Sequence, residues 1–245
     1  MKKIISLIAS LLIVINITYS QDLQTDKFET NSGELAINFV KHGSLFFEFN
    51  GKIIHVDPVV RMGDYENYPD ADLILITHHH GDHLDLNAIE LIKKENTKII
   101  LTQKCHELSE NLFDVIIMKN GDVLEISQLE IEAIPAYNIQ HKRDNGNPFH
   151  MKGEGNGYVI KFGDKKVLIA GDTENIIEIK ALKNIDIAFL PMNLPYTMTP
   201  EMVADAAKAF KPKILYPYHY GNTDTSILVE LLKDEKEIEV RIKKM

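Results

Sequence analysis

Residues 72 to 85 read Asp-Leu-Ile-Leu-Ile-Thr-His-His-His-Gly-Asp-His-Leu-Asp, an apolar run followed by a cluster of histidine and aspartate. Its apolar run, Leu73 to Ile76, predicts a buried strand. Four side chains that commonly bind metals follow the strand within six positions: His78, His80, Asp82 and His83. Such a density of imidazole and carboxylate groups directly after a strand is typical of a metal site.

The spacing of the histidines indicates how they are used. Side chains on an extended chain alternate between two faces, so His78 and His80 can point together at one ion while His79 points away. The alternative is a solvated, histidine-rich loop that binds metal loosely. The strand before the motif and the helix predicted after it favour a built site, because the chemistry needs that context.

The second part of the stretch forms a corner between strand and helix. The chain turns at Gly81, and Asp82 and His83 follow immediately, where they can face a second ion close to the first. Asp85 is predicted to cap a helix that begins at Leu86. One short segment can therefore supply about half the ligands of a two-metal site.

The pattern His78-x-His80-x-Asp82-His83 resembles the H-x-H-x-D-H signature of the metallo-β-lactamase superfamily. The similarity extends in order over roughly residues 35 to 221. It implies an α+β fold, the four-layer αββα sandwich, in which two mixed sheets pack face to face with helices outside. It also implies a fold of two similar halves, although the sequence contains no internal repeat.

By that resemblance, three further ligands come from loops at strand ends. They occupy the places of the superfamily's third histidine, its bridging carboxylate and its last histidine: His150, Asp172 and His219. The first ion would then take His78, His80 and His150. The second would take Asp82, His83 and His219, and Asp172 would bridge the two ions.

Alternatives exist for several of these residues. His141 competes with His150, and His150 is preferred because residues 152–155 resemble the approach to the next strand in hydrolytic relatives. Asp172 could instead stabilise a turn, and His219 could be a buried histidine between two tyrosines. Asp57 is equally compatible with a hydrogen bond to a ligand histidine and with a cap on its loop. The superfamily also often carries a histidine at the position of His42.

The predicted function is hydrolysis of an ester, lactone or phosphodiester by a hydroxide that bridges two divalent ions. Zinc is the expected metal, and manganese and iron are the alternatives. Asp82 and Asp172 are the predicted catalytic carboxylates, and no residue is identified as the acid for the leaving group. The similarity continues through Leu84-Asp85 in the group that includes ascorbate-6-phosphate lactonase and the phospholipase D acting on N-acyl phosphatidylethanolamines.

Two alternative activities use the same fold. A mononuclear iron dioxygenase would hold one metal per chain and consume oxygen. A true β-lactamase is disfavoured, because classical enzymes of that class carry cysteine or serine where Asp172 stands. The substrate is expected to be a small molecule, bordered by loops 58–71, 137–156 and 192–199. The possible contacts in those loops are Arg61, Tyr137, Asn138, Lys152, Asn193 and Tyr196.

The N-terminus has the organisation of an export signal. A basic start, Met1-Lys2-Lys3, precedes an apolar segment over residues 4–17, and cleavage is predicted after Ser20. The segment is shorter than the about 20 apolar residues that span a bilayer, so no membrane anchor is expected after cleavage. The mature protein is thus predicted to be periplasmic or secreted, with residues 21–33 as a polar linker and 34–245 as the domain.

Composition limits the class of partner. Removal of residues 1–20 takes away two lysines and no acids, which leaves 25 basic and 36 acidic residues and a net charge of −11. Such an acidic protein is a poor general ligand for nucleic-acid phosphates. The only cysteine, Cys105, is predicted to be buried, which leaves histidine and carboxylate as the available metal ligands. The sequence does not determine the oligomeric state.

Overall fold

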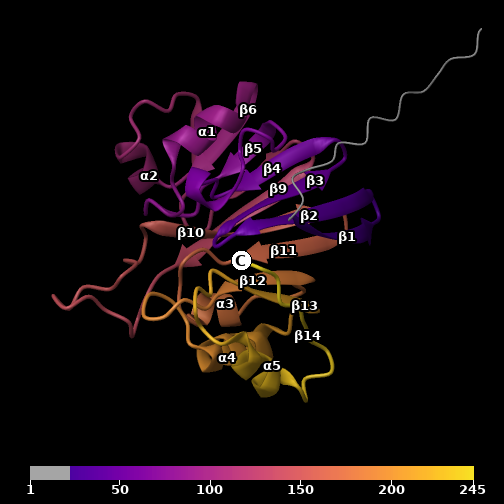
Figure 1. Ribbon diagram of the computed structural model, residues 1–245, viewed down its shortest axis with the longest axis vertical. Coiled ribbons are helices and arrows are strands. Elements are labelled where there is room, and N and C mark those ends of the chain that lie inside the picture. Colours follow the sequence, from indigo (N-terminus) through magenta and orange to yellow (C-terminus); the bar gives the residue numbers. More distant parts are fainter. Residues whose placement is uncertain (1–22) are drawn as a thin grey trace, which may run out of the picture.

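The computed structural model describes residues 23–245 as two seven-stranded sheets (Figure 1), so the predicted signal peptide lies outside the described residues. The first sheet has the order β1 (Gln24–Thr30), β2 (Gly33–Lys41), β3 (Ser44–Phe49), β4 (Lys52–Val56), β5 (Ala71–Leu75), β6 (Lys93–Leu101) and β7 (Val115–Ile117). The second has the order β14 (Glu239–Val240), β13 (Ile214–Tyr218), β12 (Ile187–Pro191), β11 (Lys165–Ile169), β10 (Gly155–Phe162), β9 (Leu129–Ala136) and β8 (Val123–Ile126).

The two sheets repeat one pairing pattern. In each sheet the first four strands along the chain pair antiparallel, and the last three are added in parallel. The chain therefore folds as two halves of the same topology, as the resemblance implied. The parallel strands place their carboxyl ends at a common edge of each sheet, and loops at such an edge can combine side chains from distant parts of the sequence.

Helices cover the outer faces of the sheets, which gives the four predicted layers (Figure 1). On the first sheet these are α1 (Leu86–Ile92) and α2 (Gln103–Glu107), and on the second they are α3 (Ile177–Lys180), α4 (Pro200–Phe210) and α5 (Thr225–Leu232). A short 3-10 helix, η1 (Val60–Met62), follows β4. Within residues 23–245, no helix has the length and apolar character needed to cross a membrane.

Strand β5 shows why the apolar run of the motif is buried. Leu73 and Leu75 lie in the core between the two sheets, whereas Ile74 and Ile76 pack on the other side with residues of α1. Both faces of the strand are therefore covered, so its sequence is continuously apolar rather than alternating. This packing fixes the end of β5, from which the histidine motif leaves.

Local signals in the sequence predict a hairpin turn at Asn50-Gly51 and helices that begin after Asp85 and Thr199, and the structure confirms all three. Asn50 and Gly51 both have positive φ, 49° and 71°, in the β3–β4 hairpin. The side chain of Asp85 accepts a hydrogen bond from the backbone N–H of Asn87 and caps α1. Thr199 caps α4 in the same way through the N–H of Met202. These elements were predicted because short-range contacts determine them.

The prediction that residues 21–33 form a linker is wrong from Gln24 onward. Residues 24–30 form β1, which pairs antiparallel with β2 from Gln24 opposite Phe39 to Thr30 opposite Gly33. The strand lies at the edge of the sheet, where polar side chains are tolerated, so its composition resembles that of a loop. The sequence also predicts a helix around residues 106–112, but the helix found, α2, covers Gln103–Glu107 and is capped by Thr102. Helix α5 and strand β14 were not predicted.

Asp26 ties this first strand to the end of the chain. Its carboxylate accepts hydrogen bonds from Tyr216 at 2.5 Å and from Lys243 at 2.5 Å, and Arg241 lies 3.3 Å away. Burial opposes ionisation, but the hydrogen bonds from Lys243 and Tyr216 hold the pKa of Asp26 below its ordinary value. Ionised Asp26 therefore connects β1 of the first sheet to β13 and the C-terminal segment of the second half.

We predict that Asp26→Asn lowers the free energy of unfolding at pH 7 by about 1–2 kcal/mol, because charge-assisted hydrogen bonds are lost. The depressed pKa means that this stabilisation is present above the ordinary pKa of 3.8 and disappears as the pH falls through the folded value. Urea unfolding of both proteins at pH 7 and near pH 3 measures the difference. Equal stability of the wild type and Asp26→Asn at pH 7 would contradict the role given to Asp26. Glu34→Gln, which removes one partner of an exposed ion pair, serves as the control.

Candidate metal centre

The predicted site residues converge from both sheets. The chain leaving β5 carries His78, His80, Asp82 and His83, and the β9–β10 loop carries His150. Asp172 follows β11 and His219 follows β13. The structure thus brings all seven predicted residues together at the edge where the parallel strands of both sheets end. The seven are His78, His80, Asp82, His83, His150, Asp172 and His219.

A first group consists of three histidines and one carboxylate. His78 Nε2 lies 3.2 Å from His80 Nδ1, and the ring of His150 lies about as far from the rings of both, at 5.0 and 4.9 Å between centroids. Asp172 Oδ2 is 3.2 Å from His150 Nε2 and 3.9 Å from His78 Nε2. The three histidines can surround one cation, and Asp172 lies beside them.

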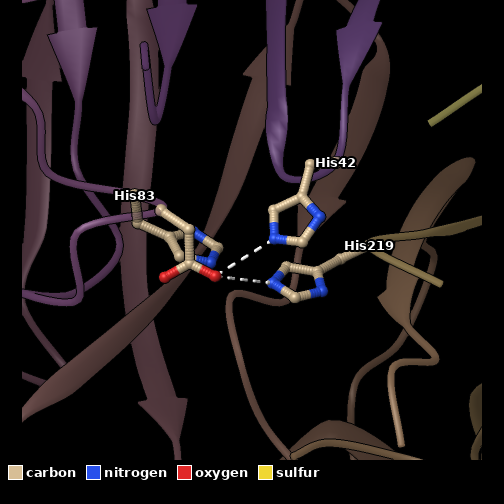
Figure 2. A group of neighbouring side chains, drawn as sticks. His42, His83 and His219 are labelled. Carbon is tan, nitrogen blue, oxygen red and sulfur yellow. Dashed lines mark hydrogen bonds and ion pairs between the residues drawn. The ribbon is translucent and has the colours of Figure 1, made fainter. Parts of the chain in front are cut away.

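A second group of side chains, which includes His83 and His219, also lies close to Asp172. Asp172 Oδ1 is 3.5 Å from His83 Nε2, and Asp172 Oδ2 is 3.5 Å from His219 Nε2. His219 Nε2 is also 3.6 Å from Asp82 Oδ2. Figure 2 shows His42 and His219 directed at one carboxylate oxygen, which is Oδ2 of Asp82, with the ring of His83 beside them.

The donor atoms of these groups fit a cation. His83 Nε2, His219 Nε2 and Asp172 Oδ1 are buried and have no hydrogen-bond partner among residues 23–245. Buried polar atoms without partners are costly, and a cation satisfies all three. Ligand atoms bound at about 2.0–2.2 Å in tetrahedral or octahedral geometry lie about 3.0–3.5 Å apart, close to the separations in the cluster. Nitrogen and oxygen donors of this kind suit zinc and similar divalent ions.

Asp57 and Thr77 orient two of the histidines. Asp57 Oδ2 accepts from His83 Nδ1 at 2.8 Å and from the hydroxyl of Thr77 at 2.6 Å. Because the Thr77 hydroxyl donates to Asp57, its oxygen accepts from His78 Nδ1, 3.0 Å away. Nδ1 of both histidines is therefore occupied, and Nε2 is the ring nitrogen that faces the cluster. Of the two interpretations of Asp57, the hydrogen bond to a site histidine is the one found.

A second buried carboxylate, Glu174, shapes the loop that carries His150. Its oxygens accept backbone N–H groups of residues 139, 140 and 141 at 2.7–2.8 Å and the side-chain amide of Asn138 at 3.0 Å. Asn138 Oδ1 in turn accepts from His150 Nδ1 at 2.6 Å. Glu174 therefore fixes the ring of His150 through Asn138. Its position two residues after Asp172 is the only sequence signal of this role.

The other histidines have different surroundings. His141 Nδ1 lies 2.9 Å from Glu174 Oε1, outside the cluster, so the structure places His150 rather than His141 beside His78 and His80. His55 is fully buried in β4, and its Nε2 donates to the carbonyl of Pro69. Cys105 is buried in α2, as predicted.

The cluster has opposing electrostatic effects on its members. Burial lowers the pKa of His78 well below its ordinary value, and burial with the neighbouring His150 lowers that of His80 to about 4, so both are neutral. Burial would also lower the pKa of His83, but the carboxylates of Asp172 and Asp57 raise it to about 9. Burial opposes ionisation of Asp172, yet the adjacent His219 and His83 hold its pKa well below the ordinary value. A binding cation must therefore displace a proton from His83.

His42 is a site residue that was considered at the sequence level but not assigned. It lies in the β2–β3 turn with a positive φ of 62°, and its Nε2 is 3.1 Å from Asp82 Oδ2. Since an ionised carboxylate can only accept, His42 Nε2–H donates to Asp82. Its ring lies on that of His219 at 3.6 Å between centroids, and its carbonyl accepts the backbone N–H of His219 at 3.0 Å. His42 thus positions two side chains of the second group.

A cavity of about 370 Å³ opens beside the cluster. Of the predicted contacts, Asn193 and Tyr196 line it. Tyr137 and Lys152 instead bond to Glu178, Asn138 holds His150, and Arg61 lies in η1. Two lining residues were not predicted, Arg143 and Phe149.

We predict that Asp57→Asn weakens metal binding by about 10–100-fold, because the amide cannot accept from His83 and Thr77 as the carboxylate does. The variant should keep the fold, since asparagine has the same shape. Competition of cobalt or zinc with a chromophoric chelator measures the affinity, and circular dichroism monitors folding. An unchanged affinity in a folded variant would contradict the orienting role.

We predict that His42→Phe lowers the affinity for the more weakly bound ion about tenfold. Phenylalanine keeps a ring against His219 but cannot donate a hydrogen bond to Asp82. His42→Gln retains an N–H donor and should recover part of the loss. Stepwise cobalt titration followed by visible absorption separates the binding events. Identical titrations for the wild type and both variants would show that His42 does not support the second group.

Comparison with known proteins places the chain among relatives of the same fold. The family described as a beta-lactamase superfamily domain matches residues 36–219. A metal-dependent hydrolase of Nanoarchaeum equitans is 32% identical over 191 residues, which cover 76% of this chain and 84% of that protein. The family match contains the histidine motif and extends through His219.

Solved structures agree with this placement. A candidate metal-dependent hydrolase from Parabacteroides distasonis has 49% sequence identity and a TM-score of 0.85, covering 91% of this chain and 99% of the other. The metallo hydrolase Igni18 of Ignicoccus hospitalis, at 23% identity, has the same fold with a TM-score of 0.72 over 86% of this chain and 95% of its own. The motif, the two-sheet fold and these matches together show that the chain belongs to the metallo-β-lactamase superfamily.

Proposed function

We propose that the chain is a metal-dependent hydrolase with a dinuclear centre that cleaves an ester, lactone or phosphodiester bond in a small molecule. His78, His80 and His150 would hold the first ion, and Asp82, His83 and His219 the second. Asp172 would bridge them. The expected metal is zinc, with manganese or iron as alternatives for the same nitrogen and oxygen donors.

The placement of Asp172 carries this proposal. Its Oδ2 lies 3.2 Å from His150 of the first group and 3.5 Å from His219 of the second, and its Oδ1 lies 3.5 Å from His83. A carboxylate whose two oxygens together reach both groups suits a bridge between two cations better than a ligand of one. Asp172 is almost fully buried, so it needs such partners.

Divalent ions held in such a site supply Lewis acidity and bring the pKa of a water molecule near neutrality. Asp82 and Asp172 offset part of the ionic charge and leave the site net positive, which favours the developing oxyanion of a hydrolytic reaction. Asp57, Asn138 and His42 hold the imidazoles and Asp82 in place before substrate arrives. The chemistry therefore requires no serine or cysteine nucleophile.

The cavity volume and the sequence motif indicate the class of substrate. The cavity volume of about 370 Å³ lies at the lower end of the range for small-molecule sites, which supports a small substrate rather than a polymer. We favour lactones and phosphodiesters because the motif, through Leu84-Asp85, resembles the lactonase and phospholipase D group. We also propose that the protein acts after export, as residues 1–20 predict.

Metal analysis of the purified mature protein, combined with a panel of lactone, phosphodiester, thioester and β-lactam substrates, tests the proposal. We expect two equivalents of metal per chain and hydrolysis without oxygen uptake. Asp172→Asn should reduce the bound metal toward one equivalent and lower hydrolysis by more than about 100-fold.

Asp144→Asn, at an exposed position of the β9–β10 loop, is the matched control and should retain both properties. One equivalent of iron with oxygen consumption would favour the dioxygenase alternative. Unchanged metal content and turnover in Asp172→Asn would refute the bridging role.

A further inference from the structure

The cavity beside the metal cluster has two chemically different walls. One wall consists of metal-site side chains, and the other consists of residues from the β9–β10 loop and the loop after β12. The first wall holds His80, Asp82, His150, Asp172 and His219, and the second holds Arg143, Phe149, Asn193 and Tyr196. Arg143 is the only cationic side chain lining this cavity in the described part of the chain.

Arg143 is held at a defined place relative to the metal site. Its guanidinium lies 5.1 Å from the centre of the Phe149 ring, and Nη2 donates to the carbonyl of Phe149 at 3.3 Å. The backbone of Arg143 closes a tight turn through its N–H to Asn147 and its carbonyl to Gly146. Phe149 directly precedes His150, whose ring is fixed by Asn138. Arg143 is therefore connected to the metal-site residue His150 by a short segment with defined hydrogen bonds. The segment lies in the loop that extends from the sheets between β9 and β10 (Figure 1).

The hydrogen-bonding capacity of Arg143 is largely unused. None of the ion pairs formed among residues 23–245 involves it, whereas Arg241 is paired with Glu239 and Asp26. A guanidinium carries five N–H donors and stays charged at all accessible pH values. Its planar fork matches a carboxylate or phosphate through two parallel hydrogen bonds. Arg143 is exposed to solvent at this cavity, so an anionic ligand can reach its free N–H donors.

The apolar side chains beside Arg143 add a second requirement. Phe149 and Tyr196 pack edge to face at 5.0 Å between ring centroids, and Tyr196 keeps nearly half of its surface exposed. These rings can cover a short hydrocarbon segment between the anionic group and the reacting bond. The small volume of the cavity keeps the two ends of such a ligand within a few bonds of each other.

We propose that Arg143, with Phe149 and Tyr196, forms a subsite for a carboxylate or phosphate group of the substrate, separate from the bond cleaved at the metal cluster. The substrate is then a small anionic ester or lactone with a short apolar segment between its charged group and its scissile group. This inference rests on the proposed hydrolase function for the reacting end of the molecule. Arg143 is accordingly a residue that determines specificity.

Matched substrates isolate the charge. Mono-4-nitrophenyl glutarate and its methyl ester differ only in one carboxylate, and both release nitrophenol on hydrolysis. For the zinc-loaded enzyme we expect a higher kcat/KM for the charged ester. Arg143→Gln should lower that value by about 10–100-fold and leave the methyl ester within about twofold. Arg143→Lys, which keeps the charge without the fork, should be intermediate, and Lys142→Gln, which removes a neighbouring charge outside the cavity, should match the wild type.

A binding measurement separates this subsite from the hydrolase function. In isothermal titration of the zinc-loaded protein, Arg143→Gln should weaken glutarate binding about tenfold or more without affecting the binding of the neutral diamide glutaramide. Titration with 3-phosphonopropionate distinguishes a preference for phosphate-type groups from one for carboxylates. Arginine-dependent glutarate binding without hydrolysis of any ester would support the subsite and reject the esterase activity. Hydrolysis or binding that is equal in Arg143→Gln, Lys142→Gln and the wild type would overturn the subsite.

Discussion

The carboxylate of Asp172 lies between two groups of histidines, and its contacts constrain the surrounding structure. Several atoms that face it, including His83 Nε2 and His219 Nε2, are buried without hydrogen-bond partners in the described chain. Such burial is unfavourable unless a cation or solvent compensates. Asp172 reaches this position because Gly171 has a positive φ of 65° and a Cβ there would lie 2.7 Å from the carbonyl oxygen of Asn156. The backbone conformation at Gly171 thus allows Asp172 to reach the cluster.

The same cluster depends on the packing of the two halves against each other. The carbonyl of His42, in the first sheet, accepts the N–H of His219 at the end of β13. The carbonyl of Thr77 accepts the N–H of Asn156 in β10, and the hydroxyl of Tyr158 donates to the carbonyl of Ile76. Each of these contacts joins strand ends of different sheets next to site residues. Cations bound between the halves would stabilise this arrangement further, because the unfolded chain has no comparable site.

The sequence predicted those features that local patterns determine. The motif after β5, the cap at Asp85 and the hairpin at Asn50-Gly51 each depend on neighbouring residues. Strand β1 was missed because an edge strand carries a polar pattern and is defined by its pairing with β2. Glu174 and Arg143 were missed for a related reason, since their roles arise only when the β9–β10 loop folds beside β11 and the cluster. Long-range contacts of this kind leave no periodicity in the sequence.

The most direct test of the account is the position of the metals in a crystal of the zinc-loaded protein, located by anomalous scattering at the zinc absorption edge. Two peaks about 3.5–4 Å apart are expected, one in each of the two groups of side chains next to Asp172. Each peak should lie about 2.0–2.2 Å from the nitrogen or oxygen atoms of its own group. A single peak, or peaks bound by residues outside these two groups, would show that Asp172 does not bridge two metal ions.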